Sequence, residues 1–243
     1  MISVDHVTKT YGKSNKPAVD DLTFSIQPGE IVGFLGPNGA GKTTTISMLV
    51  GITKPDKGKI TIHGVDVLRN PVEAKRLIGY VPDSTDPFVR LTGREYVRFM
   101  ADVYGVSQAD RDKRLPELLR TFDMEGAFDD RISSYSRGMK QKVSIIGALI
   151  HDPLVWMLDE PMVGLDPKAT ATLKAKMRAH CDEGKITFFS THGLDVAERV
   201  CDRVIIIHGG RIIASGTVEE LRNLRGEAND SSLEKLFLEL TNG

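Results

Sequence analysis

The sequence predicts an α/β fold with a parallel core sheet, an N-terminal antiparallel β part and an inserted helical subdomain. Short, continuously apolar runs, such as EIVGFLG at residues 30–36, are typical of strands buried in a parallel sheet. These runs alternate along the chain with segments of helical apolar spacing, which is the pattern of α/β domains. Between residues 84 and 150 helical spacing dominates and β-branched runs are scarce, which indicates a helical insertion into the core.

The first part of the chain is rich in strand patterns. Alternating apolar residues indicate half-buried strands in ISVDHV (2–7) and LTFSI (22–26). The apolar strand at 30–36 follows, and the segment from Lys42 fits a helix that Gly51 closes. We expect two further short strands in KITIHG and IGYVP, at residues 59–64 and 78–82.

The middle and last parts complete the predicted architecture. Helical spacing marks 92–105 and 115–124, where Pro116 either lies in a first helical turn or kinks its helix. Strand patterns return in LVWMLDEP, KITFFSTH and RVIIIHGGRIIASG, at 154–161, 185–192 and 203–216. We therefore expect one domain, divided into an α/β core (about 1–83 and 151–225), a helical subdomain (about 84–150) and a C-terminal amphipathic helix (about 230–241).

The tail, SSLEKLFLELTNG, begins with a capping box formed by Ser231 and Glu234. Its apolar residues then fall on one helical stripe, made of Leu233, Leu236, Phe237 and Leu240. This stripe either docks on its own domain or contacts a partner subunit.

Composition and charge restrict the class of protein. The chain has 243 residues, 40% of them hydrophobic and 27% charged, with a formal net charge of −1, which is ordinary for a globular protein. Without a basic excess or stripe, we expect no nucleic-acid partner. Cys181 and Cys201 form no metal or redox spacing, which indicates a reducing compartment.

Targeting and membrane signals are weak. The N-terminus already carries Asp5, His6 and Lys9, so we do not expect it to be a signal peptide. The longest apolar stretches, such as residues 143–150, fall far short of a membrane span. We therefore expect that the chain does not cross a membrane by itself.

The segment GPNGAGKT matches the phosphate-loop pattern G-x-x-x-x-G-K-[ST], with a buried strand before it and a helix after it. The glycines let backbone N–H groups point around a phosphate, the lysine adds a positive charge, and the threonine hydroxyl suits Mg²⁺. Chance is the alternative, and the strand–loop–helix context speaks against it. The predicted nucleotide-binding residues are Gly36, Pro37, Asn38, Gly39, Ala40, Gly41, Lys42, Thr43 and Thr44, with Lys42 also catalytic and Thr43 also a metal ligand.

Phosphoryl transfer also needs a metal anchor and a group that orients water. The apolar run LVWML ends in Asp159 and Glu160. Because adjacent residues of a strand point to opposite sides, we assign Asp159 to the Mg²⁺ shell and Glu160 as the base for water. His192 ends another apolar strand, where it could contact a γ-phosphate or the water. The alternatives are solvated acids at a strand end and a structural histidine.

A second candidate anion site lies in SSYSRGMKQKV, residues 133–143. A serine, a glycine two residues later and a basic run into an apolar segment form a helix-start signature. The first N–H groups of a helix lack partners and its dipole is positive there, so an anion is favoured. An ordinary capped helix is the alternative.

Together these residues resemble the nucleotide-binding subunit of an ABC (ATP-binding cassette) transporter, over nearly the whole chain from Tyr11 to the strand pair around Gly209. YSRGM at 135–139 stands where the family has LSGGQ, and MVGLDP resembles the family's D-loop, with Asp166 at its aspartate. The sequence has no N-K-x-D for guanine recognition.

The resemblance implies ATP and Mg²⁺ as cofactors and a head-to-tail dimer, either a homodimer or a pair with another ABC subunit. Each ATP would lie between one chain's phosphate loop and the other chain's signature helix. Ser136 would bond the γ-phosphate, and Gly138 would allow close backbone approach. Tyr11 would stack on the base, unless it packs on its own sheet. Stacking tolerates any base, so ATP and GTP remain open.

Three departures from the family pattern matter. Asp83 stands where the family has the Q-loop glutamine; it could still bind Mg²⁺ but adds charge. In the signature, Arg137 replaces the first glycine and Met139 the glutamine, and Arg137 could pair with phosphate. These variants look most like the export branch of bacterial ABC systems, in which ATPase and permease are separate proteins.

The resemblance therefore implies an ATP-hydrolysing subunit held on the cytoplasmic face of the cell membrane by an integral membrane permease. The permease would contact about Thr85 to Tyr96, near an exposed Phe88 and Arg90; a plain polar loop is the alternative. The competing functions are a soluble ABC ATPase for DNA repair or ribosomes, an importer subunit, and a regulatory cassette with little turnover. The sequence does not identify the substrate.

Overall fold

A computed structural model describes residues 1–12, 16–84 and 88–223. Its centre is a six-stranded sheet with the order β10-β9-β3-β8-β7-β6. Five neighbouring strands are parallel and β10 pairs antiparallel to β9 at one edge. Their bounds are Ile31–Leu35 (β3), Ile78–Val81 (β6), Val155–Leu158 (β7), Ile186–Thr191 (β8), Arg203–His208 (β9) and Arg211–Gly216 (β10). The predicted parallel core sheet is thereby confirmed.

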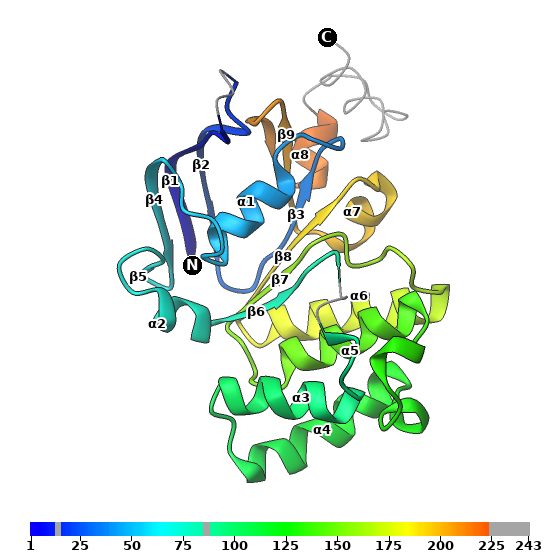
Figure 1. Ribbon diagram of the computed structural model, residues 1–243. Coiled ribbons are helices and arrows are strands. Elements are labelled where there is room, and N and C mark those ends of the chain that lie inside the picture. Colours follow the sequence, from blue (N-terminus) through cyan, green and yellow to red (C-terminus); the bar gives the residue numbers. More distant parts are fainter. Residues whose placement is uncertain (13–15, 85–87, 224–243) are drawn as a thin grey trace.

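A separate antiparallel sheet lies beside this core (Figure 1). It has four strands in the order β2-β1-β4-β5. They span Ile2–Lys9 (β1), Val19–Ile26 (β2), Lys57–Ile62 (β4) and Val65–Asp66 (β5). This is the predicted N-terminal antiparallel part, built from the segments whose apolar residues alternate.

Alternation of side chains along the central strands divides the interior into two layers. Val155 and Met157 of β7 pack toward the antiparallel sheet, together with Phe34 and Phe188. Trp156 and Leu158, the residues between and after them, pack in the other layer against the helices. All four residues of β7 are buried, which explains why the strand is apolar without interruption.

The segment between β6 and β7 is helical, as predicted (Figure 1). Thr92 begins α3 with a capping box to Glu95, and Pro116 lies inside α4 rather than in its first turn. The helices are α3 (Gly93–Val103), α4 (Gln108–Phe122) and α5 (Arg137–Leu149), with the short turns η2 (Glu125–Ala127) and η3 (Ile132–Ser134).

The remaining helices are α1 (Lys42–Leu49), α2 (Pro71–Arg76), α6 (Pro167–Asp182), α7 (Leu194–Val200) and α8 (Val218–Asn223). Of these, α1, α2, α6 and α7 connect strands, and α8 follows β10. Gly51, with φ +68°, follows the end of α1 as predicted. The predicted helix at 230–241 lies outside the described residues. Among those that are described, no helix has both the length and the apolar content needed to cross a membrane.

Candidate nucleotide-binding and catalytic site

The phosphate loop joins the end of β3 to the start of α1, as the motif requires. At two positions of the loop, close contacts with the neighbouring backbone require glycine. A Cβ on Gly36 would lie 2.5 Å from the carbonyl oxygen of Ile207, and one on Gly41 would lie 2.5 Å from that of Ala18. Gly41 also has φ +108°, a conformation that side chains disfavour. The loop can therefore curl tightly only with glycine at these positions.

Lys42 is the buried positive charge of the loop, with 7% of its surface exposed. Its Nζ donates hydrogen bonds to the carbonyl oxygens of Gly36 at 2.7 Å and Pro37 at 3.3 Å. Nζ also lies 3.6 Å from Oε1 of Glu160. The carbonyl oxygens of the loop and the Glu160 carboxylate thus compensate the charge of Lys42.

Asp159 directly follows β7 and is 1% exposed. The Ser190 hydroxyl donates to its Oδ1 at 2.5 Å, and Thr43 of the phosphate loop also hydrogen-bonds it. Burial raises the pKa of the Asp159 carboxyl, although these two hydrogen bonds oppose the rise, and the nearby charges of Asp83 and Glu160 add to it. A divalent cation would relieve this concentration of negative charge.

Glu160 sits in the left-handed region, with φ +49°. Its N–H donates to Ser190 Oγ at 2.9 Å, and its Oε2 lies 3.0 Å from Nδ1 of His192. The prediction that strand alternation separates Asp159 from Glu160 is wrong. The strand ends at Leu158, so strand alternation does not separate the two acids; both line one pocket, and the left-handed turn at Glu160 gives them different neighbours.

Ser190 is the site residue that sequence reasoning missed. It lies near the end of β8, is fully buried, and contacts both acids through one hydroxyl. The available signal was a serine within FFSTH, at the end of an otherwise apolar strand. A buried hydroxyl needs partners, and the acids following the neighbouring strand supply them.

Lys42, Thr43, Asp159 and Glu160 line one pocket, which also takes in Asp83, two residues after β6. The predicted site residues Gly36, Ala40 and His192 are not among its lining residues, and neither is Ser190. Within the described ranges, no cluster of three or more His, Cys, Asp or Glu side chains could hold a metal by itself. The oxygens of Thr43, Asp83 and Asp159 nevertheless fit Mg²⁺, which needs few protein ligands when phosphates supply others. The lining consists of Ala18, Pro37, Asn38, Gly39, Gly41, Lys42, Thr43, Thr44, Asp83, Asp159 and Glu160.

The signature segment forms the predicted helix start. Ser136 is the N-cap of α5 and accepts a hydrogen bond from the Met139 N–H at 3.2 Å. A Cβ on Gly138 would lie 2.8 Å from the carbonyl oxygen of Gly164, so α5 packs closely on the loop before α6. Asp166 caps α6, accepting from the Ala169 N–H at 2.8 Å. Neither Ser136 nor Asp166 lines its own chain's phosphate pocket.

Tyr11 lies apart from the pocket lining and is 49% exposed. Lys9 Nζ stands 5.6 Å from the centre of its ring. The half-exposed ring thus lies beside a residue of β1, and its stacking on a nucleotide base stays a prediction. An accessible aromatic face is what base stacking requires.

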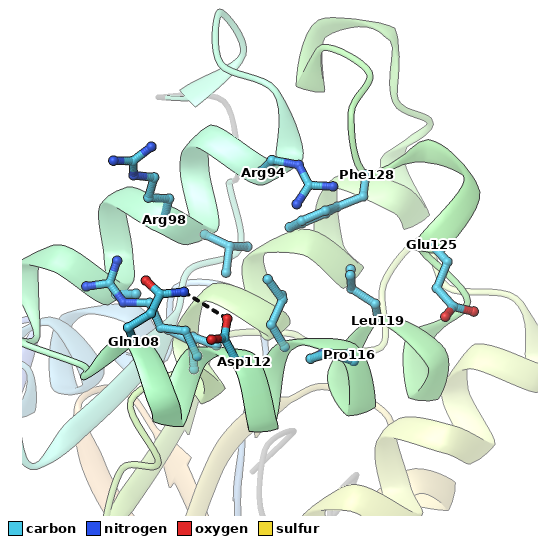
Figure 2. Close-up of a pocket in the computed structure, with 13 residues that line it drawn as sticks. Arg94, Arg98, Gln108, Asp112, Pro116, Leu119, Glu125 and Phe128 are labelled. Carbon is cyan, nitrogen blue, oxygen red and sulfur yellow. Dashed lines mark hydrogen bonds between the residues drawn. The ribbon is translucent and has the colours of Figure 1, made fainter.

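A larger hollow lies elsewhere, between α3 and α4 (Figure 2). Two arginines of its rim are already paired, Arg94 with Asp129 and Arg111 with Asp102, both at 2.6 Å. Arg94 also lies 5.0 Å above the ring of Phe128. The hollow shares no lining residue with the phosphate pocket and belongs to the packing of the helical layer.

Comparison with known proteins agrees with this geometry. The ABC transporter family matches residues 19–163. The ABC-type transporter ATP-binding protein EcsA of Bacillus subtilis (strain 168) is 38% identical over 241 residues, which cover 99% of this chain and 96% of EcsA. The chain belongs to the ABC transporter family. The Nod factor export ATP-binding protein I of Paraburkholderia xenovorans (strain LB400) is 40% identical, over 90% of this chain and 72% of that protein.

Solved structures confirm the fold of this ABC protein. One, the ATP-binding subunit of an ABC transporter, is 37% identical with a TM-score of 0.93 and covers 99% of each chain. Another is a dimeric ATP-binding cassette in a post-hydrolysis state bound to ADP and Pi. It is 26% identical with a TM-score of 0.79, over 89% of this chain and 98% of that chain. This chain is thus an ATP-binding subunit of an ABC transporter and an ATPase.

Proposed function

We propose that the chain is the ATP-hydrolysing motor of an exporter, working as a head-to-tail dimer with a separate integral membrane permease on the cytoplasmic face of the membrane. The observation that carries the catalytic part is the position of Glu160. Ser190 fixes its backbone, His192 contacts its carboxylate, and Lys42 lies 3.6 Å away beside the phosphate loop.

Each residue then has a separate task. Glu160 accepts the proton of the attacking water, and His192 orients that carboxylate and the γ-phosphate. Lys42 stabilises charge on the transferred phosphoryl group. Thr43 and Asp159, with Asp83 at the pocket edge, hold the Mg²⁺ that neutralises phosphate charge when it is bound.

The dimer explains why one chain carries two anion sites. Ser136 and Gly138 lie at the start of α5, outside their own chain's pocket, where the backbone N–H groups and helix dipole favour an anion. We assign them, with Asp166, to the partner's nucleotide. The dimeric cassette bound to ADP and Pi, which shares this fold, supports the formation of a dimer.

Glu160→Gln tests the catalytic assignment. Loss of a general base lowers turnover by about 10²- to 10⁴-fold, while ATP binding is retained because glutamine keeps the size of the side chain. We expect steady-state ATP turnover to fall in this range and an ATP-dependent dimer to accumulate in size-exclusion chromatography.

Glu117→Gln is the matched control, because Glu117 is an exposed acid on α4 that pairs with Lys176. It should leave turnover unchanged. Normal hydrolysis by Glu160→Gln would show that Glu160 is not the base.

Docking of the permease is supported by an apolar groove between β6, α3 and α5. Its lining includes Tyr80, Phe88, Tyr96 and Met100. Phe99 continues this surface: its ring centre lies 6.0 Å from that of Phe88, and the residue is 46% exposed. An apolar groove with an exposed aromatic rim suits a short amphipathic helix.

The groove corrects one expectation about the docking segment. Phe88 was expected to be exposed, but it is half-buried, with its ring centre 4.8 Å from that of Tyr96. Phe88→Asp would therefore disturb packing as well as docking. Arg90 and Phe99 are exposed and serve better as probes; residues 85–87 lie outside the described part.

Arg90→Asp and Phe99→Asp should each uncouple transport from hydrolysis. Phe99→Asp places a charge on an apolar docking surface, and Arg90→Asp reverses the charge of an exposed residue two positions after Phe88. Both changes oppose association with the permease without touching the phosphate pocket. We expect loss of transport-linked resistance or export in cells, with ATP turnover of the isolated subunit unchanged.

Ile52→Asp provides the comparison, since Ile52 is 66% exposed in the turn after α1. Transport that survives Arg90→Asp and Phe99→Asp as well as it survives Ile52→Asp would remove the groove from the docking surface.

The direction of transport rests on relatives alone. Those named for export or resistance include the Nod factor export protein I and the linearmycin resistance ATP-binding protein LnrL of Bacillus subtilis (strain 168), which is 36% identical. We extend export to this chain on that basis.

A further inference from the structure

The structure pairs two residues that depart from the family pattern. Arg137, the first residue of α5, has its Nη2 at 3.9 Å from Oδ1 of Asp83, at the end of β6. Arg137 stands in the signature segment, and Asp83 stands at the Q-loop position. We propose that Arg137 is a positioning residue that holds Asp83 at the edge of the phosphate pocket, and that the Mg²⁺ of a bound nucleotide competes with it for this carboxylate.

Asp83 is placed to be shared in this way. It lines the phosphate pocket with Lys42, Thr43 and Asp159. It is also close enough for its charge to raise the pKa of Asp159. On its other side it faces the Arg137 guanidinium, so one carboxylate connects the metal-binding oxygens to the signature helix.

The stem of the Arg137 side chain lies against the D-loop backbone. A Cβ on Gly164 would lie 2.8 Å from Cδ and 2.9 Å from Cγ of Arg137. The stem of the arginine therefore passes close to the backbone at Gly164, and its guanidinium lies toward Asp83. Signature, D-loop and Q-loop positions meet at this one side chain.

The strength of the pair suits competition with a metal. About two thirds of the Arg137 side chain and more than half of the Asp83 side chain are exposed, at 66% and 58%. Exposed pairs are weak and are screened by salt. A divalent cation next to the same carboxylate carries twice the charge of the guanidinium, so it can displace Arg137.

In the proposed dimer, on which this step rests, the Arg137–Asp83 pair connects the two nucleotide sites. Arg137 belongs to the helix start that serves the partner's nucleotide, whereas Asp83 belongs to the chain's own pocket. When metal and nucleotide fill the pocket of the same chain, Arg137 is released from Asp83. Its guanidinium can then contact the phosphate of the partner's nucleotide. The pair therefore links the occupancy of one site to the signature of the other.

The test is a double-mutant cycle on metal binding by the full chain. The variants are Arg137→Gln, Asp83→Asn and the combination, with Arg137→Lys as the conservative variant. The probe is Mn²⁺, whose free ion is counted by electron paramagnetic resonance, in the presence of ADP. ADP lacks the γ-phosphate on which the proposed dimer depends, so the measurement reports on single chains.

We expect Arg137→Gln to tighten Mn²⁺ binding roughly two- to fivefold, because the carboxylate loses its competing cation. Arg137→Lys should restore most of the wild-type affinity. In the Asp83→Asn background Arg137→Gln should have no effect, and 0.5 M salt should shrink the effect in the wild-type background.

Arg69→Gln is the control, because the exposed Arg69 guanidinium also lies 3.9 Å from a carboxylate, that of Asp66, away from the phosphate pocket. An unchanged Mn²⁺ affinity in Arg137→Gln would overturn the proposal. So would an equal shift with and without Asp83, because Arg137 would then act only as a nearby charge. Failure of Glu160→Gln to dimerise would remove the dimer but leave this result standing.

Discussion

Ser190 connects the two catalytic-site acids through a single hydroxyl. It donates to the Asp159 carboxylate at 2.5 Å and accepts from the Glu160 N–H at 2.9 Å. Hydrogen bonds to a charged group are worth about 1.5–3 kcal/mol, and an unpaired buried donor adds a further cost. Ser190 therefore holds Asp159 and Glu160, the proposed metal ligand and the proposed base, in their relative positions.

Ser190→Ala should weaken Mn²⁺ binding in the presence of nucleotide and lower kcat, each by about 10- to 100-fold, the range that one lost charged hydrogen bond gives. Ser144→Ala is the control, because Ser144 is a buried serine of α5 that hydrogen-bonds Tyr96 instead. If both variants bind Mn²⁺ and turn over ATP alike, Ser190 has no positioning role.

Most residues that line the phosphate pocket were predictable from the sequence, because phosphate loops and acids at strand ends follow local patterns. Glu160 was predicted as the base for water and His192 as a contact of the γ-phosphate or that water, and their side chains lie 3.0 Å apart. Ser190 and the left-handed backbone at Glu160 were missed. Both depend on how β7 and β8 are aligned side by side, and a single strand's pattern does not carry that information.

At the scale of elements, His151 joins the ends of two helices. It lies just after α5, and its ring stacks on Tyr104, just after α3, with ring centres 3.7 Å apart. Burial lowers the pKa of His151 to about 4, from an ordinary 6.5. The folded chain thus keeps this histidine neutral where the unfolded chain protonates it.

This shift predicts a dependence of stability on pH. Between pH 6.5 and 4 the unfolded state binds more protons, so the free energy of unfolding falls as the pH falls through this window. The loss is at most about 3 kcal/mol. His151→Phe keeps an aromatic ring against Tyr104 and should remove that part of the loss, as measured by urea denaturation at pH 7 and pH 4.5. An identical pH dependence in both proteins would contradict the assignment to His151.

Helix and strand positions were largely predictable from the sequence because caps and apolar periods are local. Thr92 with Glu95, and Ser136, start α3 and α5 where capping residues were available. The start of α4 was not predictable in this way. The helix begins at Gln108, so Pro116 lies inside it. The stretch before Pro116 is mostly polar and carries a weak apolar signal.

At the scale of the whole molecule, two sheets and a helical layer bring distant segments to one edge. The phosphate loop follows β3, Asp83 follows β6, the two acids follow β7 and His192 follows β8. These strands are parallel, so their carboxyl ends meet at the same side of the sheet. The order of the strands was not predictable from sequence patterns. Parallel strands by themselves, however, imply that their carboxyl ends lie at one edge of the sheet.

The groove beside β6 and α3 lies next to this edge, and Tyr80 belongs to its lining while Asp83 belongs to the phosphate pocket. A permease helix in the groove would thus sit a few residues from the nucleotide. Packed contacts of this kind can carry coupling between a nucleotide and a membrane partner.

The most direct test of the motor-subunit account is a pull-down of tagged Glu160→Gln protein from its native membranes, in mild detergent with ATP and Mg²⁺. We expect an integral membrane permease to be recovered with it, and less of that protein with the Phe99→Asp variant in the same background. Recovery of soluble protein, ribosomes or nucleic acid without any membrane protein would leave the ATPase chemistry in place and contradict the transporter.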